Sequence, residues 1–309
     1  MKPKHWFIFI LLGAIWSSSF MWIKIAVDEI GPMTLVAFRV LFGLLFGVAV
    51  IFIQRTQMPR SLKEWSPLWI LGITNVAIPF FLISWGEQSI DSAVAAILDA
   101  TVPLFTILIA HYLLHDDKMT VPKVLGLLIG FAGVVILMSK DIGESLGSVL
   151  GQLAVVLACA FYAGSSVYAR KTTENTPGIL RSAGPLVSAT AVMWLATFLV
   201  ESPVEIPQAG ITWIALLFLG ILGSGVAFVM VYYLIHEIGP TRTSMVTYLF
   251  PLGGVLLGVV FLNEELSWQV FVGGVLVILS LAVANMRPQK KERTMEEQAA
   301  ADSRTASGL

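Results

Sequence analysis

The sequence predicts an all-α integral membrane protein whose ten transmembrane helices form two inverted five-helix repeats. Three observations predict this fold class: the composition, ten apolar runs of membrane-spanning length, and an internal repeat. Of the 309 residues, 57% are hydrophobic and only 13% are charged, and the mean hydropathy is +0.84. A soluble globular chain is about 25% charged. The composition therefore excludes a soluble enzyme, a nucleic-acid-binding protein and a disordered chain.

Ten apolar runs divide the chain into predicted spans, because a helix needs about 20 apolar residues to cross the hydrocarbon core of a bilayer. In order, they are 6–27, 32–53, 67–86, 92–114, 122–139, 147–169, 179–200, 211–235, 240–262 and 268–286. The first run follows Lys2 and Lys4, as in a signal peptide, but it lacks a small-residue cleavage pattern and is predicted to be retained. The polar segment 287–309 is predicted to be a disordered cytoplasmic tail.

The distribution of basic residues predicts which side of the membrane each loop faces, because Lys and Arg are enriched in cytoplasmic loops. With the N-terminus inside, sixteen of the 19 Lys and Arg residues fall on the inner side, and the other three are Lys24, Arg39 and Lys140. The predicted outer loops carry Asp28, Glu29, Glu87, Asp91, Glu201 and Glu205. We therefore expect a multi-pass protein of the cytoplasmic (inner or plasma) membrane with both termini in the cytoplasm.

An internal repeat relates the two halves of the chain. A shift of 148 residues places 89–138 on 237–286 and aligns Pro103 with Pro251 and Gly126 with Gly274. The acidic pairs Asp116–Asp117 and Glu264–Glu265 also align. A shift of 146 residues aligns Trp16 with Tyr162 and Ser19 with Ser165 near the starts of the halves. Because each half has five predicted spans, the second half enters the membrane in the opposite sense, and inverted repeats are typical of transporters.

Four sequence motifs resemble one transporter family. They are W-S-S-S-F-M-W-I-K at 16–24, N-V-A-I-P-F at 75–80, A-A-I-L-D-A-T-V-P-L-F from Ala95, and T-Y-L-F-P-L from Thr247. Together they resemble the EamA-type branch of the drug/metabolite transporter superfamily. The resemblance implies a first repeat over 5–139, a second over 147–286, and export of small metabolites or amino acids. One departure is Asp99, because relatives often have a neutral residue at this position.

Asp99 and Arg39 are ionisable residues predicted to lie inside the membrane. Each follows the outer end of its span by seven residues, which places both about 10 Å deep. Intramembrane charges are costly, so such residues are candidates for function. Asp99 is expected either to bind a proton or a cationic part of the substrate, or to form a structural ion pair with Arg39. A third possibility is that Arg39 extends to the outer headgroups.

Polar residues and prolines on matched helix faces predict a central substrate cavity. Asp99 in the fourth span matches Thr247 in the ninth, and Tyr248 follows it. Pro79, Pro103 and Pro251 are predicted to kink their helices and to free backbone carbonyl groups. The further cavity candidates are Trp16, Ser19, Asn75, Tyr162, Ser166, Phe228 and Tyr232. Aromatic and hydroxyl groups suit a partly apolar substrate, whereas the alternative is that they serve in interfacial belts and core packing.

Small residues and loop acids have predicted structural roles. The G-x-x-x-G pairs Gly43/Gly47, Gly126/Gly130 and Gly254/Gly258 allow close helix contact, which favours packing inside a monomer over a homodimer interface. The loop acids Asp116 and Glu264 are expected to cap helices. The sequence therefore leaves a monomer or a homodimer open.

The function predicted from these features is secondary active transport. We expect an exporter of small metabolites, amino acids or drug-like compounds that works by alternating access, with protons as a candidate coupling ion. No phosphate-binding loop, cofactor, nucleic-acid partner or metal site is predicted, and His111 and His115 lack a partner cluster. The alternatives are import of a small nutrient or, less favoured, a multi-pass membrane enzyme.

Overall fold

Every regular element in the described part of the chain is a helix. The computed structural model describes residues 2–113, 119–139, 146–238, 243 and 245–286, and it contains no strand in these residues. The elements of the first half are α1 (Pro3–Val27), α2 (Pro32–Gln54), α3 (Leu62–Leu71), η1 (Gly72–Ala77), α4 (Ile78–Gly86), α5 (Ser92–Asp99), α6 (Val102–Leu113) and α7 (Val121–Met138). Those of the second half are α8 (Leu146–Thr172), α9 (Gly178–Val200), α10 (Gly210–Leu217), η2 (Phe218–Val226), α11 (Ala227–Ile238), η3 (Met245–Tyr248), α13 (Leu249–Leu262) and α14 (Trp268–Ala284).

Apolar helices of membrane-spanning length make up most of the bundle. Within the described ranges, nine helical segments are long and apolar enough to cross a bilayer, and α14 is a shorter apolar helix of 17 residues. The prediction of an all-helical membrane fold is therefore confirmed. Residues 114, 240–242 and 244 of the predicted spans, and the predicted tail 287–309, lie outside the described residues.

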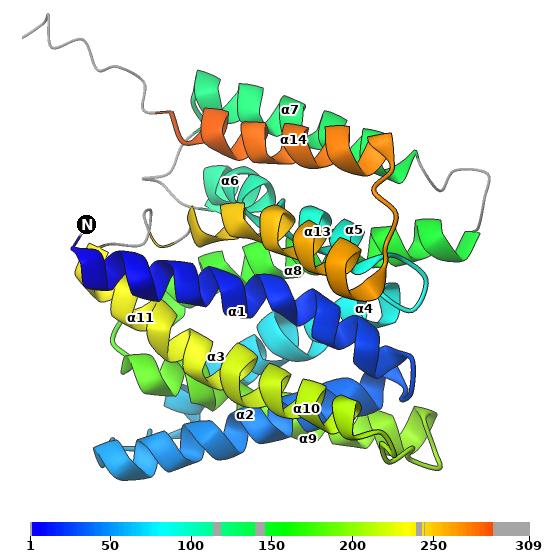
Figure 1. The fold of residues 1–309 in the computed structure, drawn as a ribbon. Helices are drawn as coiled ribbons and strands as arrows, with labels where there is room; N and C mark the ends of the chain where they lie inside the picture. The colour runs from blue at the N-terminus through cyan, green and yellow to red at the C-terminus, as the bar shows by residue number, and fades with distance from the viewer. Residues whose placement is uncertain (1, 114–118, 140–145, 239–242, 244, 287–309) are drawn as a thin grey trace, which may run out of the picture.

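Helix contacts repeat between the two halves. Helices α7 and α14 pack together along one edge of the bundle, while α2 packs against α9 at the opposite edge (Figure 1). Helix α4 of the first half contacts α8 of the second, and the matching contact joins α10, η2 and α11 of the second half to α1 of the first. Helix α5 packs on α13, its partner in the repeat. Residues of both halves lie in one apolar core that includes Leu35, Ile97, Val155 and Leu216.

Four spans are interrupted at matching positions of the two halves. The third and eighth spans contain the π-helical segments η1 and η2, whereas the fourth breaks between α5 and α6 and the ninth begins with the 3-10 turn η3. Pro79, Pro103 and Pro251 each lie just after one of these interruptions, where a missing N–H costs no helical hydrogen bond. Helix η2 has no proline, but it contains Gly220, Gly223 and Gly225.

The predicted G-x-x-x-G pairs pack inside the chain. A Cβ atom at Gly47 would lie 2.6 Å from the Cβ of Ala183 in α9, and one at Gly126 would lie 2.6 Å from the Cβ of Ala284 in α14. A Cβ atom at Gly254 would lie 2.2 Å from the Cβ of Ala96 in α5. These glycines allow helices of opposite halves to touch.

Candidate functional site

Asp99 is buried at the break in the fourth span. It is the last residue of α5, Ala100 caps that helix, and α6 begins at Val102. The side chain is 8% exposed, and its Oδ1 lies 4.0 Å from the Sγ of Cys159 in α8. Because Cys159 belongs to the second half, the carboxyl group of Asp99 lies at an interface between the halves.

Arg39 is buried in α2 and is held by residues of two other spans. Its Nε donates to the Oγ of Ser224 in η2 at 3.1 Å, and its guanidinium lies 3.7 Å from the centre of the Phe80 ring in α4. The interaction of a cation with an aromatic face is favourable, and it strengthens away from water. Arg39 therefore does not extend to the headgroups.

Arg39 and Asp99 share one electrostatic environment without direct contact. Among the contacts of the described residues, no ion pair joins their side chains. Each nevertheless acts electrostatically on the other, and both act on Tyr162 in α8. The direct ion pair was one of the alternatives for these two residues. In the described residues the two charged groups are instead separate, and both act electrostatically on Tyr162.

Trp16 joins the two halves beside this group. Its Nε1 donates to the backbone oxygen of Gly223 in η2 at 3.1 Å. The indole ring makes edge-to-face contacts with Phe228 and Phe250, with centroid distances of 5.9 and 6.0 Å. Ser19 is buried on the same helix and donates to the backbone oxygen of Ile15 at 3.1 Å. The predicted aromatic candidates Trp16 and Phe228 therefore lie together.

The other predicted candidates occupy different surroundings. Asn75 is half-buried within the π-helical segment η1. Ser166 is exposed and donates to its own helix, whereas its neighbour Ser165 is buried and donates to the Oγ1 of Thr74 at 2.9 Å. Sequence reasoning aligned Ser165 with Ser19 in the repeat but chose Ser166 as the cavity candidate. The sequence alone does not show which of two adjacent hydroxyls faces the interior of the bundle.

The candidates of the ninth span are Thr247 and Tyr248, both half-buried in η3. The hydroxyl of Tyr248 donates to the backbone oxygen of Leu281 at 2.6 Å and accepts from the Nδ2 of Asn285 at 2.6 Å. These bonds attach η3 to α14 and leave this hydroxyl engaged in helix packing. The side chain of Tyr232, the remaining candidate, lies outside the described part of the chain.

Three glutamates connect the two halves at one end of the bundle. We call this end the acidic end; it comprises the loops 28–31, 87–91, 201–209 and 263–267. The Glu201 carboxylate accepts from the backbone N–H groups of Met33 and Thr34 at 2.9 and 2.8 Å, and Glu264 accepts from those of Ser92 and Ala93 at 2.7 and 3.0 Å. The third is Glu29.

Glu29 accepts from the backbone of Gln208 and Ala209 and from the hydroxyl of Thr212. These hydrogen bonds, that of Thr212 first, hold the pKa of the Glu29 carboxyl below its usual range. Each of the three glutamates thus lies at the N-terminus of a helix from the opposite half, where negative charge is favourable. The capping role predicted for Glu264 is confirmed, although it caps α5 of the other half, and Asp116 lies outside the described residues.

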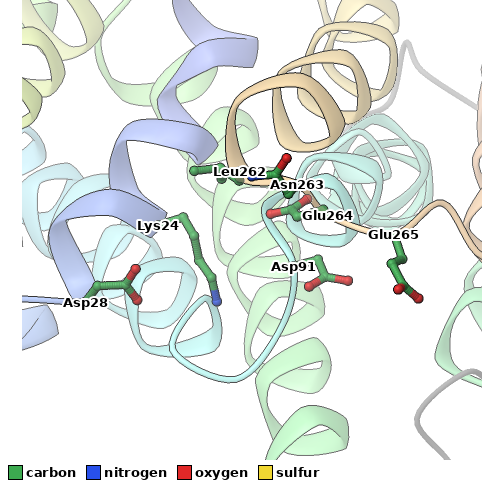
Figure 2. Close-up of a pocket in the computed structure, with 7 residues that line it drawn as sticks. All are labelled: Lys24, Asp28, Asp91, Leu262, Asn263, Glu264 and Glu265. Atoms are coloured by element: carbon green, nitrogen blue, oxygen red, sulfur yellow. The ribbon is translucent and has the colours of Figure 1, made fainter.

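A hollow of about 450 Å³ opens at the acidic end (Figure 2). It is lined by Lys24, Asp28, Asp91, Leu262, Asn263, Glu264 and Glu265. The Lys24 side chain extends toward the loop between α4 and α5, and its Nζ donates to the backbone oxygens of Glu87 and Ile90 at 2.6 and 3.0 Å. The hollow is separate from the Asp99 and Arg39 group, and its acids make it attractive to cations.

Glu264→Gln is expected to lower the free energy of unfolding by about 1–2 kcal/mol, because a neutral amide interacts less favourably with the N-terminus of α5. Equilibrium unfolding in mixed detergent and sodium dodecyl sulfate micelles measures this change. Glu265→Gln is the matched control, since Glu265 is exposed and adjacent. Equal stabilities of the two variants would contradict the capping role of Glu264.

Sequence reasoning missed Ser224 and Phe80, the two contacts of Arg39. Phe80 lies inside the quoted motif at 75–80, directly after Pro79. Ser224 lies in a glycine-rich stretch, G-I-L-G-S-G-V from Gly220, which signals an irregular helix. Neither signal identifies a partner for Arg39, because that contact depends on how α2, α4 and η2 pack.

A family profile, two sequence relatives and a solved structure each match most of this chain. Residues 4–139 and 149–286 each match the sequence profile of the EamA-like transporter family. The chain is 24% identical over 268 residues to "Uncharacterized transporter YoaV" of Bacillus subtilis (strain 168), covering 85% of this chain and 90% of the relative. It is 26% identical over 257 residues to "Uncharacterized inner membrane transporter YedA" of Escherichia coli (strain K12), with 83% and 82% covered. A solved crystal structure has the same fold, with a TM-score of 0.69 at 21% identity over 94% of this chain and 100% of that one.

The apolar helices of membrane-spanning length are those of a multi-pass membrane protein. The chain belongs to the EamA-like transporter family, within the drug/metabolite transporter superfamily. It is accordingly a transporter and not an enzyme.

Proposed function

We propose that the protein is a secondary active exporter of small metabolites, amino acids or drug-like compounds. One observation carries this proposal: the ionisable side chains of Asp99 and Arg39 are buried between two apolar halves, without a direct ion pair in the described structure. Buried charges are costly, and in a transporter they mark the substrate or ion pathway. In this proposal Asp99 binds a proton or a cationic group of the substrate, and Arg39 binds an anionic group.

Alternating access is the proposed mechanism. Two of the four interruptions border the Asp99 and Arg39 group, since Asp99 ends α5 and Ser224, which bonds Arg39, lies in η2. Interrupted helices at the centre of matched repeats are typical of carriers whose halves move about a fixed site. We place the acidic end on the outer side, with both termini in the cytoplasm, on the basis of the Lys and Arg distribution. The structure then corresponds to a carrier closed on its outer side by the three glutamates.

The test is a comparison of spent medium from three cultures. Cells that overproduce the protein are compared, by untargeted mass spectrometry, with cells that carry Asp99→Asn and with cells that carry the empty vector. We expect a small metabolite to accumulate only with the intact protein. Equal accumulation with Asp99→Asn would remove Asp99 from the mechanism, and depletion of a nutrient instead of accumulation would establish import.

A further inference from the structure

Glu87 differs from the other glutamates of the acidic end. Glu29, Glu201 and Glu264 each accept hydrogen bonds from the start of a helix. Glu87 directly follows α4 and is 0% exposed, and neither of its carboxyl oxygens has a hydrogen-bond partner among the described residues. An ionised carboxylate buried in this way is very unfavourable, and such a group becomes neutral by binding a proton.

Lys24 lies beside Glu87 without forming an ion pair with its side chain. The Lys24 Nζ donates to the backbone oxygen of Glu87 at 2.6 Å, but no contact between their charged groups is present in the described part of the chain. An ionised Glu87 would be expected to turn toward this ammonium group, because a buried charge is stabilised only when it is paired. The observed arrangement therefore fits a neutral carboxyl group.

Four charged groups on other segments act on Glu87: Lys24 of α1, Glu264 of the loop before α14, Arg39 of α2 and Asp99 of α5. Burial raises the pKa of the Glu87 carboxyl well above its usual range. Lys24 counteracts this rise in pKa, Glu264 adds to it, and the effects of Arg39 and Asp99 oppose each other. The surrounding charges thus leave burial as the dominant influence.

A contact between the halves seals the region around Glu87. Gly86 packs so closely on α8 that a Cβ atom there would lie 2.7 Å from the backbone oxygen of Gly151. Ser89 Oγ donates to the backbone oxygen of Gly147 at 3.0 Å, and Ser148 Oγ donates to that of Ser89 at 3.1 Å. Because α8 belongs to the second half, separation of the halves at the acidic end breaks these contacts and brings water to Glu87.

We propose that Glu87 is the proton-binding site of the outer gate: its carboxyl group holds a proton while the acidic end is closed and releases it to the outer medium when the halves separate. The proposal rests on the alternating access proposed above. An open, hydrated Glu87 returns to the ordinary glutamate pKa of about 4.3. At pH values between that pKa and the raised pKa of the closed form, opening releases one proton. The ratio of open to closed protein therefore rises by up to about tenfold per pH unit.

The test measures opening of the acidic end without any substrate. Ile90, which is 4% exposed, is replaced by cysteine in a Cys159→Ala background, since Cys159 is the single cysteine of the chain. The protein in liposomes is labelled with a membrane-impermeant maleimide between pH 5.5 and pH 8. Each rate is divided by that of the same protein unfolded in detergent at the same pH, which removes the titration of the thiol itself.

We expect the corrected rate to rise with pH in the reporter protein and in the further variant Glu87→Asp, and to stay low and flat with Glu87→Gln. Glu205→Gln, in an exposed part of the acidic end, should leave the rise unchanged. A rate independent of pH in the reporter protein, or the same rise with Glu87→Gln, would overturn the proposal. If the protein exports a metabolite but its corrected labelling rate does not rise with pH, only the proposed role of Glu87 is contradicted. If the labelling rate rises with pH but no metabolite is exported, only the proposed export is contradicted.

Discussion

Arg39→Leu is expected to lower the free energy of unfolding by on the order of 3 kcal/mol and to abolish transport. Leucine cannot donate to Ser224 or interact electrostatically with the face of Phe80, and Asp99 loses the positive charge that acts on it. Removing one member of a buried charge group is strongly destabilising, because the remaining charge is left uncompensated. Equilibrium unfolding in mixed micelles measures the stability, and the spent-medium comparison measures transport.

A double variant separates the electrostatic contribution from lost packing. Arg39→Leu combined with Asp99→Asn should recover part of the stability, because no uncompensated charge remains in the interior. Recovery of stability without recovery of export would agree with a role of both charges in substrate binding. Arg60→Leu, at an exposed loop position, is the control for removal of a positive charge. Strict additivity of the two substitutions would show that Arg39 and Asp99 are not coupled.

Gly72→Ala is expected to destabilise the protein by about 1–3 kcal/mol, the range of overpacked cores. A Cβ atom at Gly72 would lie 2.0 Å from the Oγ of Ser188 and 2.2 Å from the backbone oxygen of Pro185, both in α9. The serine hydroxyl can move, but the backbone oxygen is fixed by its helix. The substitution therefore pushes η1 away from α9, and unfolding in mixed micelles detects the loss.

The matched control for this substitution is Gly164→Ala in α8. A Cβ atom at Gly164 has no neighbour within 4 Å, so alanine should be neutral or stabilising through its higher helix propensity. Ser188→Ala in the Gly72→Ala background removes one of the two clashes and should restore little, because the clash with Pro185 remains. Full recovery of stability in that double variant would show that the clash with the serine hydroxyl, and not the clash with the backbone oxygen, causes the destabilisation.

The helical spans were predictable because a membrane-spanning helix requires only one continuous apolar segment of the sequence. A bilayer demands a long apolar run, and the predicted span 32–53 corresponds to α2 at Pro32–Gln54. Residue counts along two helices predict the same depth for Arg39 and Asp99, and both residues are buried in the structure. The interruptions beside Pro79, Pro103 and Pro251 were indicated by proline chemistry, whereas η2 has no proline and was not anticipated.

The partners of the charged groups could not be predicted. Glu87 and Glu201 both follow the end of an apolar run in the sequence, yet Glu201 caps α2 and Glu87 is buried without a partner for its carboxyl group. The difference comes from the packing of α4 on α8 and from the position of Lys24, which are tertiary contacts between distant segments. The choice of Ser224 and Phe80 around Arg39 has the same origin.

The most direct test of alternating access is to lock the acidic end. A hydrogen bond of 2.8 Å joins the side chains of Thr34 and Glu201 across the two halves. Both residues are replaced by cysteines in the Cys159→Ala background. A short bis-methanethiosulfonate reagent then links them, and a reductant reverses the link. We predict that export of the metabolite found in the spent medium stops on linking and returns on reduction, while export by each single-cysteine variant does not change when the reagent is added. Full export by the linked protein would contradict a mechanism in which the two halves separate at this end.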